Sequence, residues 1–359
     1  MRLPALCQWF IFEDRQAVER TAATIEELQI KEFRILFSWA DWDRPGGQEW
    51  FDFFVDRIGE AGPKLIPALF YTPPEQAIGG KTSHPPKDIL SYARFAGQMI
   101  ERYGSRFDWV QIWNEPNWQP YWDWDIDPDG SIFCQMAIPA IDIVHAAGKK
   151  AVLGGLTPYD PAWLTMAARC STVRGKSEEK GHGSLPNGSL PNGSLPNGSL
   201  SNGLLHKPDA VGLHHSPSWT NQRRKWYGWA SEIMTARAHL DGLEKAGLAK
   251  SGIEIWIAEA GYATVDDGAI LDDARRRGER EQTKFFDYTR RQAGADKIIW
   301  YSAIDQPPEN MTDDELNMNG GRQEAAYHFG LETLDGRRKP LFYHWKDLAA
   351  EPSSSSDRL

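Results

Sequence analysis

The stretch "VQIWNEPNW", residues 110–118, brings a glutamate to the end of a hydrophobic strand. It begins with apolar residues that are typical of a buried strand and continues into Asn114, Glu115 and Pro116. A carboxylate in that position costs free energy unless it has partners or a function. Because successive strand residues point to opposite faces, Asn114 and Glu115 can face one site together only if the strand bends at its tip. We therefore predict an irregular strand end, which Pro116 terminates.

Around this stretch, apolar runs alternate with amphipathic stretches along the whole chain. We predict strands at residues 6–10, 33–39, 64–70, 110–115, 151–156, 210–214, 253–259 and 297–303. Helices are predicted between and after them, at residues 14–30, 49–62, 88–104, 131–147, 160–172, 222–247, 272–293 and 340–349. Strands that are apolar throughout indicate a parallel sheet with a covered outer face, and eight strand–helix units close most naturally into a single (β/α)8 TIM barrel. An open doubly wound sheet is the competing α/β architecture, but no Gly-rich phosphate turn follows an early strand.

One segment interrupts the alternation, because residues 183–203 repeat Asn-Gly-Ser-Leu-Pro with a five-residue period. Such a composition cannot bury enough apolar surface to fold, so we predict a disordered low-complexity insert over about residues 176–206, between helix 5 and strand 6. Loops that lead from helix to strand lie on the N-terminal face of a barrel, away from active sites. The chain is thus expected to form one barrel over residues 1–350, with a disordered tail at 351–359.

Charge and composition exclude some classes of function. The chain of 359 residues carries a net charge of −10, which argues against a nucleic-acid partner or an anionic membrane surface. No apolar run approaches the length of a transmembrane helix, and the first residues lack the pattern of a signal peptide. We therefore expect a cytoplasmic location, although residues upstream of Met1 could be missing. The oligomeric state is not predicted.

The three cysteines are Cys7, Cys134 and Cys170. They are odd in number, widely spaced and contain no CxxC pair, so the sequence shows neither a disulfide framework nor a zinc motif. We expect buried, reduced thiols.

Several predicted strands end in polar residues that can carry chemistry. Strand 4 ends in Glu115, strand 7 in Glu259 and strand 6 in His214, while strand 2 contains Arg34. Two carboxylates that face each other across a barrel mouth suit glycosidic bond cleavage, in which one is protonated and the other ionised. Two negative charges close together raise the pKa of one carboxyl group, which makes it a usable acid. The structural alternative for each glutamate is a helix cap or an ion pair with Arg34.

The motifs around these residues resemble the clan A glycoside hydrolases, whose (β/α)8 barrels carry catalytic glutamates on strands 4 and 7. "WNEPN" at 113–117 and "WIAEAGY" at 256–262 carry most of the resemblance. It extends to "EFRILFSWADWDRPGGQEW" at 32–50 and "HFGLETLDGRRKPLFYHW" at 328–345. The nearest family is family 39, the β-xylosidase-like and exopolysaccharide endoglycosidase group, with family 5 as close kin. The motif is specific for the clan but not for the sugar.

This resemblance implies a retaining β-glycosidase with Glu115 as general acid/base and Glu259 as nucleophile. It implies that Asn114 binds the sugar 2-hydroxyl and that Arg34 keeps Glu259 ionised. His214 matches the strand-6 histidine of the clan.

The clan usually has a tyrosine two residues beyond that histidine, whereas this chain has Ser216. Tyr301 or Tyr262 could supply the missing contact to the nucleophile. Trp300 would lie under the sugar, and Trp118 and Trp39 would be further aromatic contacts. A count of 16 tryptophans, more than the 15 phenylalanines or 11 tyrosines, fits stacking against sugars as well as core packing.

The expected partner is an oligosaccharide or polysaccharide, and no cofactor or metal is expected. The basic run Arg223, Arg224 and Lys225 could meet a charged polysaccharide, but the simpler interpretation, which we favour, is a solvated helix start. Two other classes of function stay open. One is a metal-dependent sugar isomerase or aldolase, with Glu115, Glu259, His214 and Asp305 as ligands. The other is a sugar-binding barrel without catalytic activity.

Overall fold

Eight parallel strands form a closed barrel in the computed structural model, which describes residues 3–170, 203–215, 230–264, 272–292, 294–307 and 328–351. Each strand pairs with the next along the chain, and the last pairs with the first. The strands are β1 (Ala5–Gln8), β2 (Glu32–Ser38), β3 (Lys64–Phe70), β4 (Trp109–Ile112), β5 (Lys150–Leu156), β6 (Ala210–His215), β7 (Glu254–Ala260) and β8 (Lys297–Tyr301). The predicted single TIM barrel is confirmed.

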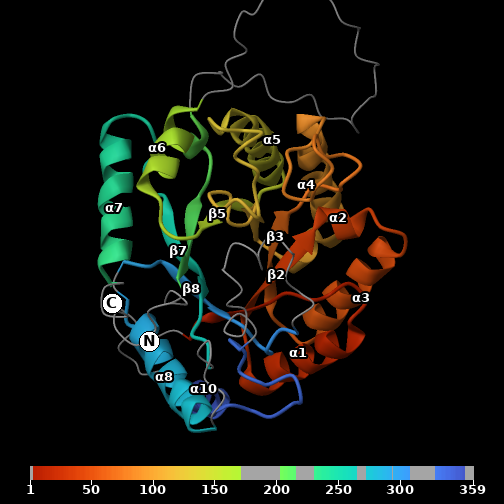
Figure 1. Ribbon diagram of the computed structural model, residues 1–359, viewed down its shortest axis with the longest axis vertical. Helices are drawn as coiled ribbons and strands as arrows, with labels where there is room; N and C mark the ends of the chain where they lie inside the picture. The colour runs from red at the N-terminus through yellow and green to blue at the C-terminus, as the bar shows by residue number, and fades with distance from the viewer. Residues whose placement is uncertain are drawn as a thin grey trace, which may run out of the picture.

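Helices surround the strands (Figure 1). Those in the described ranges are α1 (Arg15–Leu28), α2 (Trp39–Trp42), α3 (Gly47–Glu60), α4 (Ile89–Tyr103), α5 (Ser131–Ala146), α6 (Pro161–Arg169), α7 (Ala230–Lys245), α8 (Asp272–Arg290) and α10 (Pro340–Ala350), with short 3-10 turns η1 (Gly104–Arg106) and η2 (Leu204–His206). Helix α1 illustrates how sequence sets these bounds: the Asp14 side chain accepts the Ala17 N–H at 3.0 Å and so caps the helix. Its apolar residues recur on one face, which is buried against the barrel: Val18, Ala22, Ile25 and Leu28.

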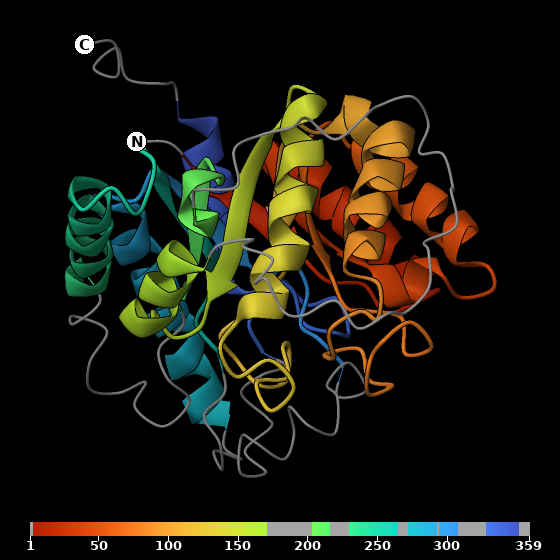
Figure 2. The same ribbon diagram turned by 90° about the horizontal axis from the view of Figure 1, so that it is seen from above.

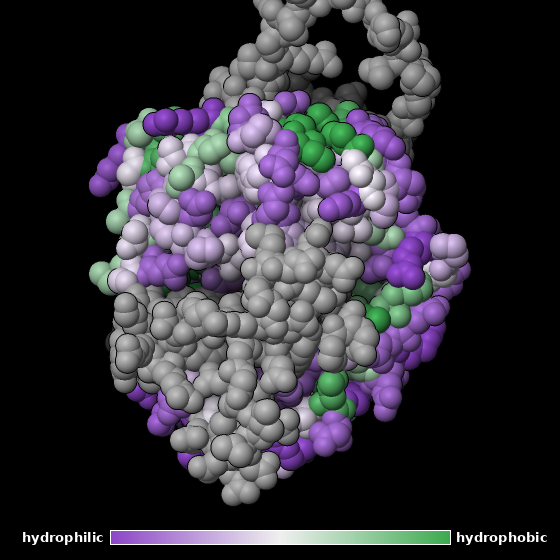
Figure 3. Space-filling model, viewed as in Figure 1, coloured by the Kyte–Doolittle hydropathy of each residue, from purple (hydrophilic) through white to green (hydrophobic). Residues whose placement is uncertain are grey.

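The strands all run in one direction, so their carboxyl ends share one end of the barrel. The loops that follow β3 and β4, orange and yellow in Figure 2, lie side by side at this end. Within the described ranges, hydrophilic residues cover most of the face shown in Figure 3, with smaller hydrophobic patches between them. None of the described helices combines the length and the apolar character that crossing a membrane requires.

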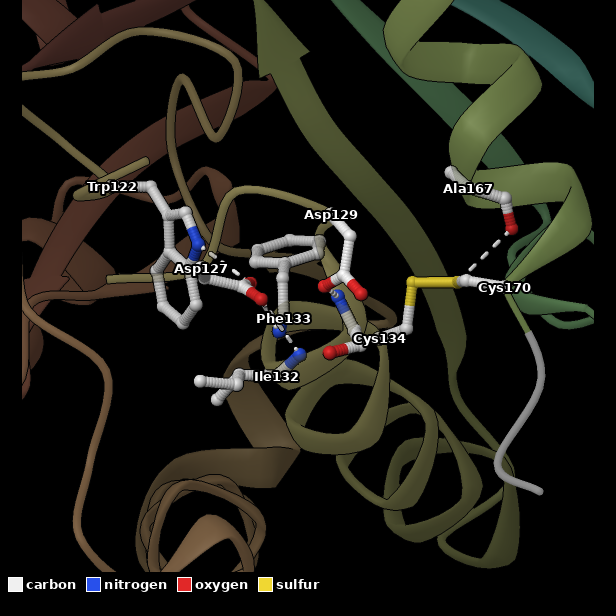
Figure 4. The surroundings of a disulfide bond; sticks show 9 residues. Trp122, Asp127, Asp129, Ile132, Phe133, Cys134, Ala167 and Cys170 are labelled. Atoms are coloured by element: carbon white, nitrogen blue, oxygen red, sulfur yellow. Dashed lines mark hydrogen bonds between the residues drawn. A yellow bond between two sulfur atoms is a disulfide. The ribbon is translucent and has the colours of Figure 1, made fainter. Parts of the chain in front are cut away.

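The cysteine prediction is wrong for two of the three residues, because Cys134 and Cys170 form a disulfide (Figure 4). They are 36 residues apart in sequence, but Cys134 lies in α5 and Cys170 directly follows α6, so their Cα atoms are 6.5 Å apart. Cys7 is free and buried, as expected. Spacing alone could not reveal the bond, since packing of the two helices creates it. The cytoplasmic location stays a prediction.

Several predicted boundaries also change, and two of them bear on the insert and the site. The low-complexity insert was expected to extend to residue 206, but Leu204–His206 form η2, in which Leu204 and Leu205 are fully buried. Residues 176–202 lie outside the described residues, as do 352–359 of the predicted tail. Strand β4 ends at Ile112, three residues before the predicted end.

Candidate active site

The early end of β4 places its two polar residues on one site. After Ile112 the chain leaves the extended conformation, because Trp113 (φ +64°) and Glu115 (φ +46°) both adopt the left-handed region. That conformation costs a non-glycine residue about 1–3 kcal/mol, so surrounding contacts must hold it in place. The buried Trp113 ring supplies one such contact by donating from Nε1 to the Tyr121 carbonyl at 2.9 Å. The predicted irregular tip is confirmed.

Arg34 of β2 connects four strands inside the barrel. Its Nη1 donates to Glu259 Oε1 at 2.5 Å and to the Cys7 sulfur at 3.3 Å. Its Nη2 donates to Asn114 Oδ1 at 2.7 Å, and its Nε donates to Gln111 Oε1 at 2.8 Å. Burial lowers the pKa of Arg34, but the Glu259 carboxylate and the Cys7 sulfur outweigh it, so the net shift of this pKa is upward. The guanidinium is therefore a fixed positive charge beside Glu259.

His214 joins the two glutamates. Its Nδ1 lies 2.6 Å from Glu115 Oε1, and its Nε2 lies 3.6 Å from Glu259 Oε1. One oxygen of each carboxylate and one ring nitrogen of His214 lie within 4.8 Å of one another. A Cβ on Gly155 would approach His214 Nε2 to 2.2 Å, so only glycine at that position leaves room for the ring. Glu115, His214 and Glu259, from the ends of β4, β6 and β7, thus lie close together.

Both glutamate side chains remain partly accessible, with 11% of Glu115 and 19% of Glu259 exposed. Arg34 beneath them is fully buried. The two carboxylates are therefore partly exposed, whereas the cation that contacts Glu259 is not.

Two predicted sugar contacts are wrong. Trp300 is fully buried, and its ring packs 5.2 Å from Phe286 and 6.1 Å from Phe285 of α8. It therefore belongs to the layer between barrel and helices. Trp39 is also buried, stacked 5.7 Å from Phe95 of α4. For Trp300, neighbouring strand residues alternate between two faces, and an apolar run does not show which of them points inward. Trp39 was predicted to end a strand but begins α2.

The other predicted aromatic contacts stay predictions. Tyr301, next to Trp300, is partly exposed and packs edge-on against Phe329, with ring centroids 5.8 Å apart. Tyr262 is buried with its ring 5.8 Å from that of Phe285. Trp118 is half-buried in the loop after β4 and stacks on Tyr121 at 5.7 Å. Ser216 and the basic run at 223–225 lie outside the described residues.

Among the described residues, the group close enough to share a metal ion consists of Glu115, His214 and Glu259. Asp305, the fourth ligand expected for a metal-dependent enzyme, does not belong to this group. It is buried in an ion pair with Lys339, with 2.6 Å between Oδ1 and Nζ. The structure therefore corrects the predicted four-ligand set to three.

Sequence reasoning missed Gln111 and Cys7 as partners of Arg34. Gln111 carries a detectable signal, because it is a polar residue in the middle of an otherwise apolar strand. Cys7 carries none, since a buried thiol is common in any core.

Comparison with solved structures shows similarity in fold at low sequence identity. No protein-family model and no curated protein matches the sequence. A family 39 glycoside hydrolase from the gut symbiont Bacteroides cellulosilyticus WH2 superposes with a TM-score of 0.62 at 13% identity, over 97% of this chain and 64% of that one. An exo-β-1,4-mannosidase from Opitutaceae bacterium strain TAV5 gives 0.55 at 15%, over 97% of this chain and 59% of that one. A family 1 β-glucosidase from Thermotoga maritima gives 0.56 at 14%, over 93% of this chain and 86% of that one.

The chain therefore spans less than two thirds of the length of the first two structures. At these identities the similarity shows the fold alone, a closed (β/α)8 barrel.

Proposed function

We propose that this protein is a retaining glycoside hydrolase that cleaves β-linked glycosides by double displacement, with Glu115 as acid/base and Glu259 as nucleophile. The observation that carries the proposal is the meeting of two accessible carboxylates from β4 and β7, with oxygens within 4.8 Å of each other. Retaining enzymes hold their carboxyl groups about 5–5.5 Å apart, whereas inverting enzymes leave a wider gap for water.

The two glutamates have different partners, and these fit different roles. In the first step a Glu259 oxygen bonds to the anomeric carbon, the glycosidic C–O bond breaks, and Glu115 gives its proton to the leaving oxygen. In the second step Glu115 takes a proton from water, the water oxygen bonds to the anomeric carbon, and Glu259 leaves as a carboxylate. The Arg34 guanidinium stabilises the carboxylate that exists before and after these steps.

Asn114 fits the proposed contact to the sugar. Its Oδ1 accepts from Arg34, so Nδ2 is the part of the amide that can donate to the 2-hydroxyl. A bond to this hydroxyl strengthens in the transition state and contributes to rate.

We propose that Trp118 contacts the leaving-group side of the substrate. Its backbone N–H donates to the Glu115 carbonyl at 2.9 Å, so it lies one turn beyond the proposed acid. Its ring stacks on Tyr121, which stacks on Tyr71 at 5.5 Å with ring planes 8° apart. This supported, half-buried ring suits the apolar face of a sugar. An oligosaccharide or polysaccharide is the proposed substrate class.

Trapping with 2-deoxy-2-fluoro glycosides of several sugars, followed by peptide mass mapping, tests the proposal. We expect a covalent label on Glu259, which also identifies the sugar that binds. Glu254→Gln, at the opposite end of the same strand, is the matched control and should label like the wild type, whereas Glu259→Gln should not label. A label on another residue, or hydrolysis without any label, would contradict the mechanism.

A metal-dependent sugar isomerase or aldolase is the second candidate, because Glu115, His214 and Glu259 are close enough to share an ion. The hydrogen bond from Arg34 to Glu259 competes with that use of the carboxylate. Activity that disappears with EDTA and returns with a divalent metal would favour this candidate. Sugar binding without turnover would favour a catalytically silent barrel.

A further inference from the structure

We infer that Gln111 of β4 is a positioning residue that sets the geometry of both carboxylates, through Arg34 on one side and the bent strand tip on the other. The inference rests on the proposed function, since it concerns how the two glutamates are held for double displacement.

Gln111 lies inside the barrel, with only 1% of its surface exposed. Both ends of its amide are hydrogen-bonded. Oε1 accepts from Arg34 Nε at 2.8 Å, while Nε2 donates to the Trp113 carbonyl at 2.8 Å and lies 3.5 Å from Asn114 Oδ1. One side chain thus touches the cation and the turn that carries the proposed acid.

The bond to Arg34 fixes the direction of the guanidinium. Gln111 and Asn114 accept from Nε and Nη2, and this leaves Nη1 for Glu259. A guanidinium is planar and rigid, so anchoring two of its nitrogens sets the position of the third. Without Gln111, a buried N–H of Arg34 would lose its acceptor, and the cation could tilt away from Glu259.

The bond to the Trp113 carbonyl fixes the other carboxylate. Trp113 and Glu115 both have positive φ, and this bend is what turns Glu115 toward His214. The Trp113 carbonyl lies between these two residues, so the Gln111 side chain that donates to it holds a conformation that the backbone does not prefer. Losing this bond would let the strand tip relax and would move the acid relative to the nucleophile.

The test compares Gln111→Leu, which removes both hydrogen bonds at similar volume, with Gln111→Glu, which keeps an acceptor for Arg34. We expect the leucine variant to lower kcat by about 10- to 100-fold with little change in KM, because a small misplacement of reacting groups has effects of this size. Its rate of inactivation by the 2-fluoro glycoside should fall in parallel. For Gln111→Glu we expect a decrease in log kcat about half as large as that of Gln111→Leu, since the glutamate oxygen still accepts from Arg34.

Gln8→Leu is the matched control. Gln8 is a buried amide of β1 whose hydrogen bonds go to the backbone of Trp9 and Ile304. If both glutamines only satisfy buried polar groups, the two leucine variants should lose stability alike and leave kcat alike. We expect both to lower the unfolding temperature but only Gln111→Leu to lower kcat. Should Gln111→Leu fail to fold, Gln111→Met, which also lacks both bonds, takes its place with the same expected loss.

The inference is overturned if the folded leucine or methionine variant has a kcat within twofold of wild type, if Gln8→Leu loses as much, or if Gln111→Glu is no better than the apolar variant. Failure of the proposed function is visible separately, because the wild-type protein itself would then take no label on Glu259.

Discussion

Two fully buried cations, Arg34 and Lys339, each contact a carboxylate near the same end of the barrel, yet they do different things. Arg34 pairs with Glu259 at 2.5 Å, and Lys339 pairs with Asp305 at 2.6 Å. The carboxylates differ in accessibility, because 19% of the Glu259 side chain is exposed but only 2% of the Asp305 side chain. We infer that a buried cation paired with a partly exposed carboxylate belongs to a functional site. A buried cation paired with a fully buried carboxylate has a structural role and stabilises the fold.

The remaining contacts of Lys339 support this distinction. Its Nζ also donates to Thr264 Oγ1 and to the His328 carbonyl, each at 3.1 Å, and Asp305 accepts the Gly330 N–H at 2.8 Å. The pair thereby ties together the segments that follow β7 and β8. Burial lowers the pKa of Lys339, and the opposing effect of Asp305 does not fully compensate, whereas the pKa of Arg34 is shifted upward. The pKa values of the two buried cations therefore shift in opposite directions.

The largest expected effect is at Glu259. Glu259→Gln should lower kcat by about 10,000-fold or more, the scale of loss when an essential nucleophile is removed. The unfolding temperature should change by only a few degrees, because the amide oxygen still accepts from Arg34. Steady-state kinetics and thermal unfolding measure the two effects. Activity that survives this change would mean that the Arg34–Glu259 pair only stabilises the fold.

Lys339→Met should produce the opposite pattern. It leaves Asp305 buried without its cation, and breaking a buried ion pair costs about 3–5 kcal/mol of unfolding free energy. Denaturant titration measures this loss, and kcat of the folded fraction should stay within severalfold of wild type. Full stability combined with lost activity would assign Lys339 to the site instead.

Arg34→Lys keeps the positive charge but removes the planar guanidinium group and its several hydrogen-bond donors. We expect kcat/KM to fall by about 100-fold, because a point donor cannot hold Glu259, Asn114 and Gln111 together. Arg20→Lys is the matched control, since Arg20 donates to the backbone carbonyls of residues 333 and 334 and forms an ion pair with the buried Glu332 at 3.5 Å. Equal activity of the two variants would show that charge alone suffices at Arg34.

The smallest effect concerns Cys7, the thiol beside Arg34. Burial raises its pKa to about 12 from an ordinary value of 9.0, with Arg34 opposing and Glu259 adding to the shift. The folded state therefore keeps a proton that the unfolded state loses, so this contribution to stability is complete below pH 9 and disappears as pH rises toward 12.

Unfolding free energy measured between pH 9 and 11 should accordingly fall less steeply for Cys7→Ala, by roughly 1.4 kcal/mol per pH unit. Parallel slopes for variant and wild type would show that the thiol titrates alike in both states. The same pH titration cannot be applied to the Lys339–Asp305 pair, because substituting Lys339 removes the ion pair itself.

The barrel fold, and the position of Glu115 and Glu259 at the same end of it, could be predicted from the sequence alone. Strand and helix periodicity is local, so the eight units can be recognised without knowing how they pack. Parallel strands in a barrel end on one face, which brings Glu115 and Glu259 together from their positions in the chain alone. The conflict between strand alternation and the neighbours Asn114 and Glu115 likewise predicted the bend at the tip of β4.

Tertiary structure alone decided which side chains point where and which distant residues meet. Trp300 and Trp39 were expected at the sugar but pack against aromatic residues of helices. The face that Trp300 presents depends on the register of its strand, and Trp39 lies in α2 and not in β2. The Cys134–Cys170 disulfide depends on how α5 packs beside α6, and spacing in sequence carries no trace of it. The same holds for Gln111, whose two hydrogen bonds exist only because Arg34 and the bent strand tip converge on it in the closed barrel.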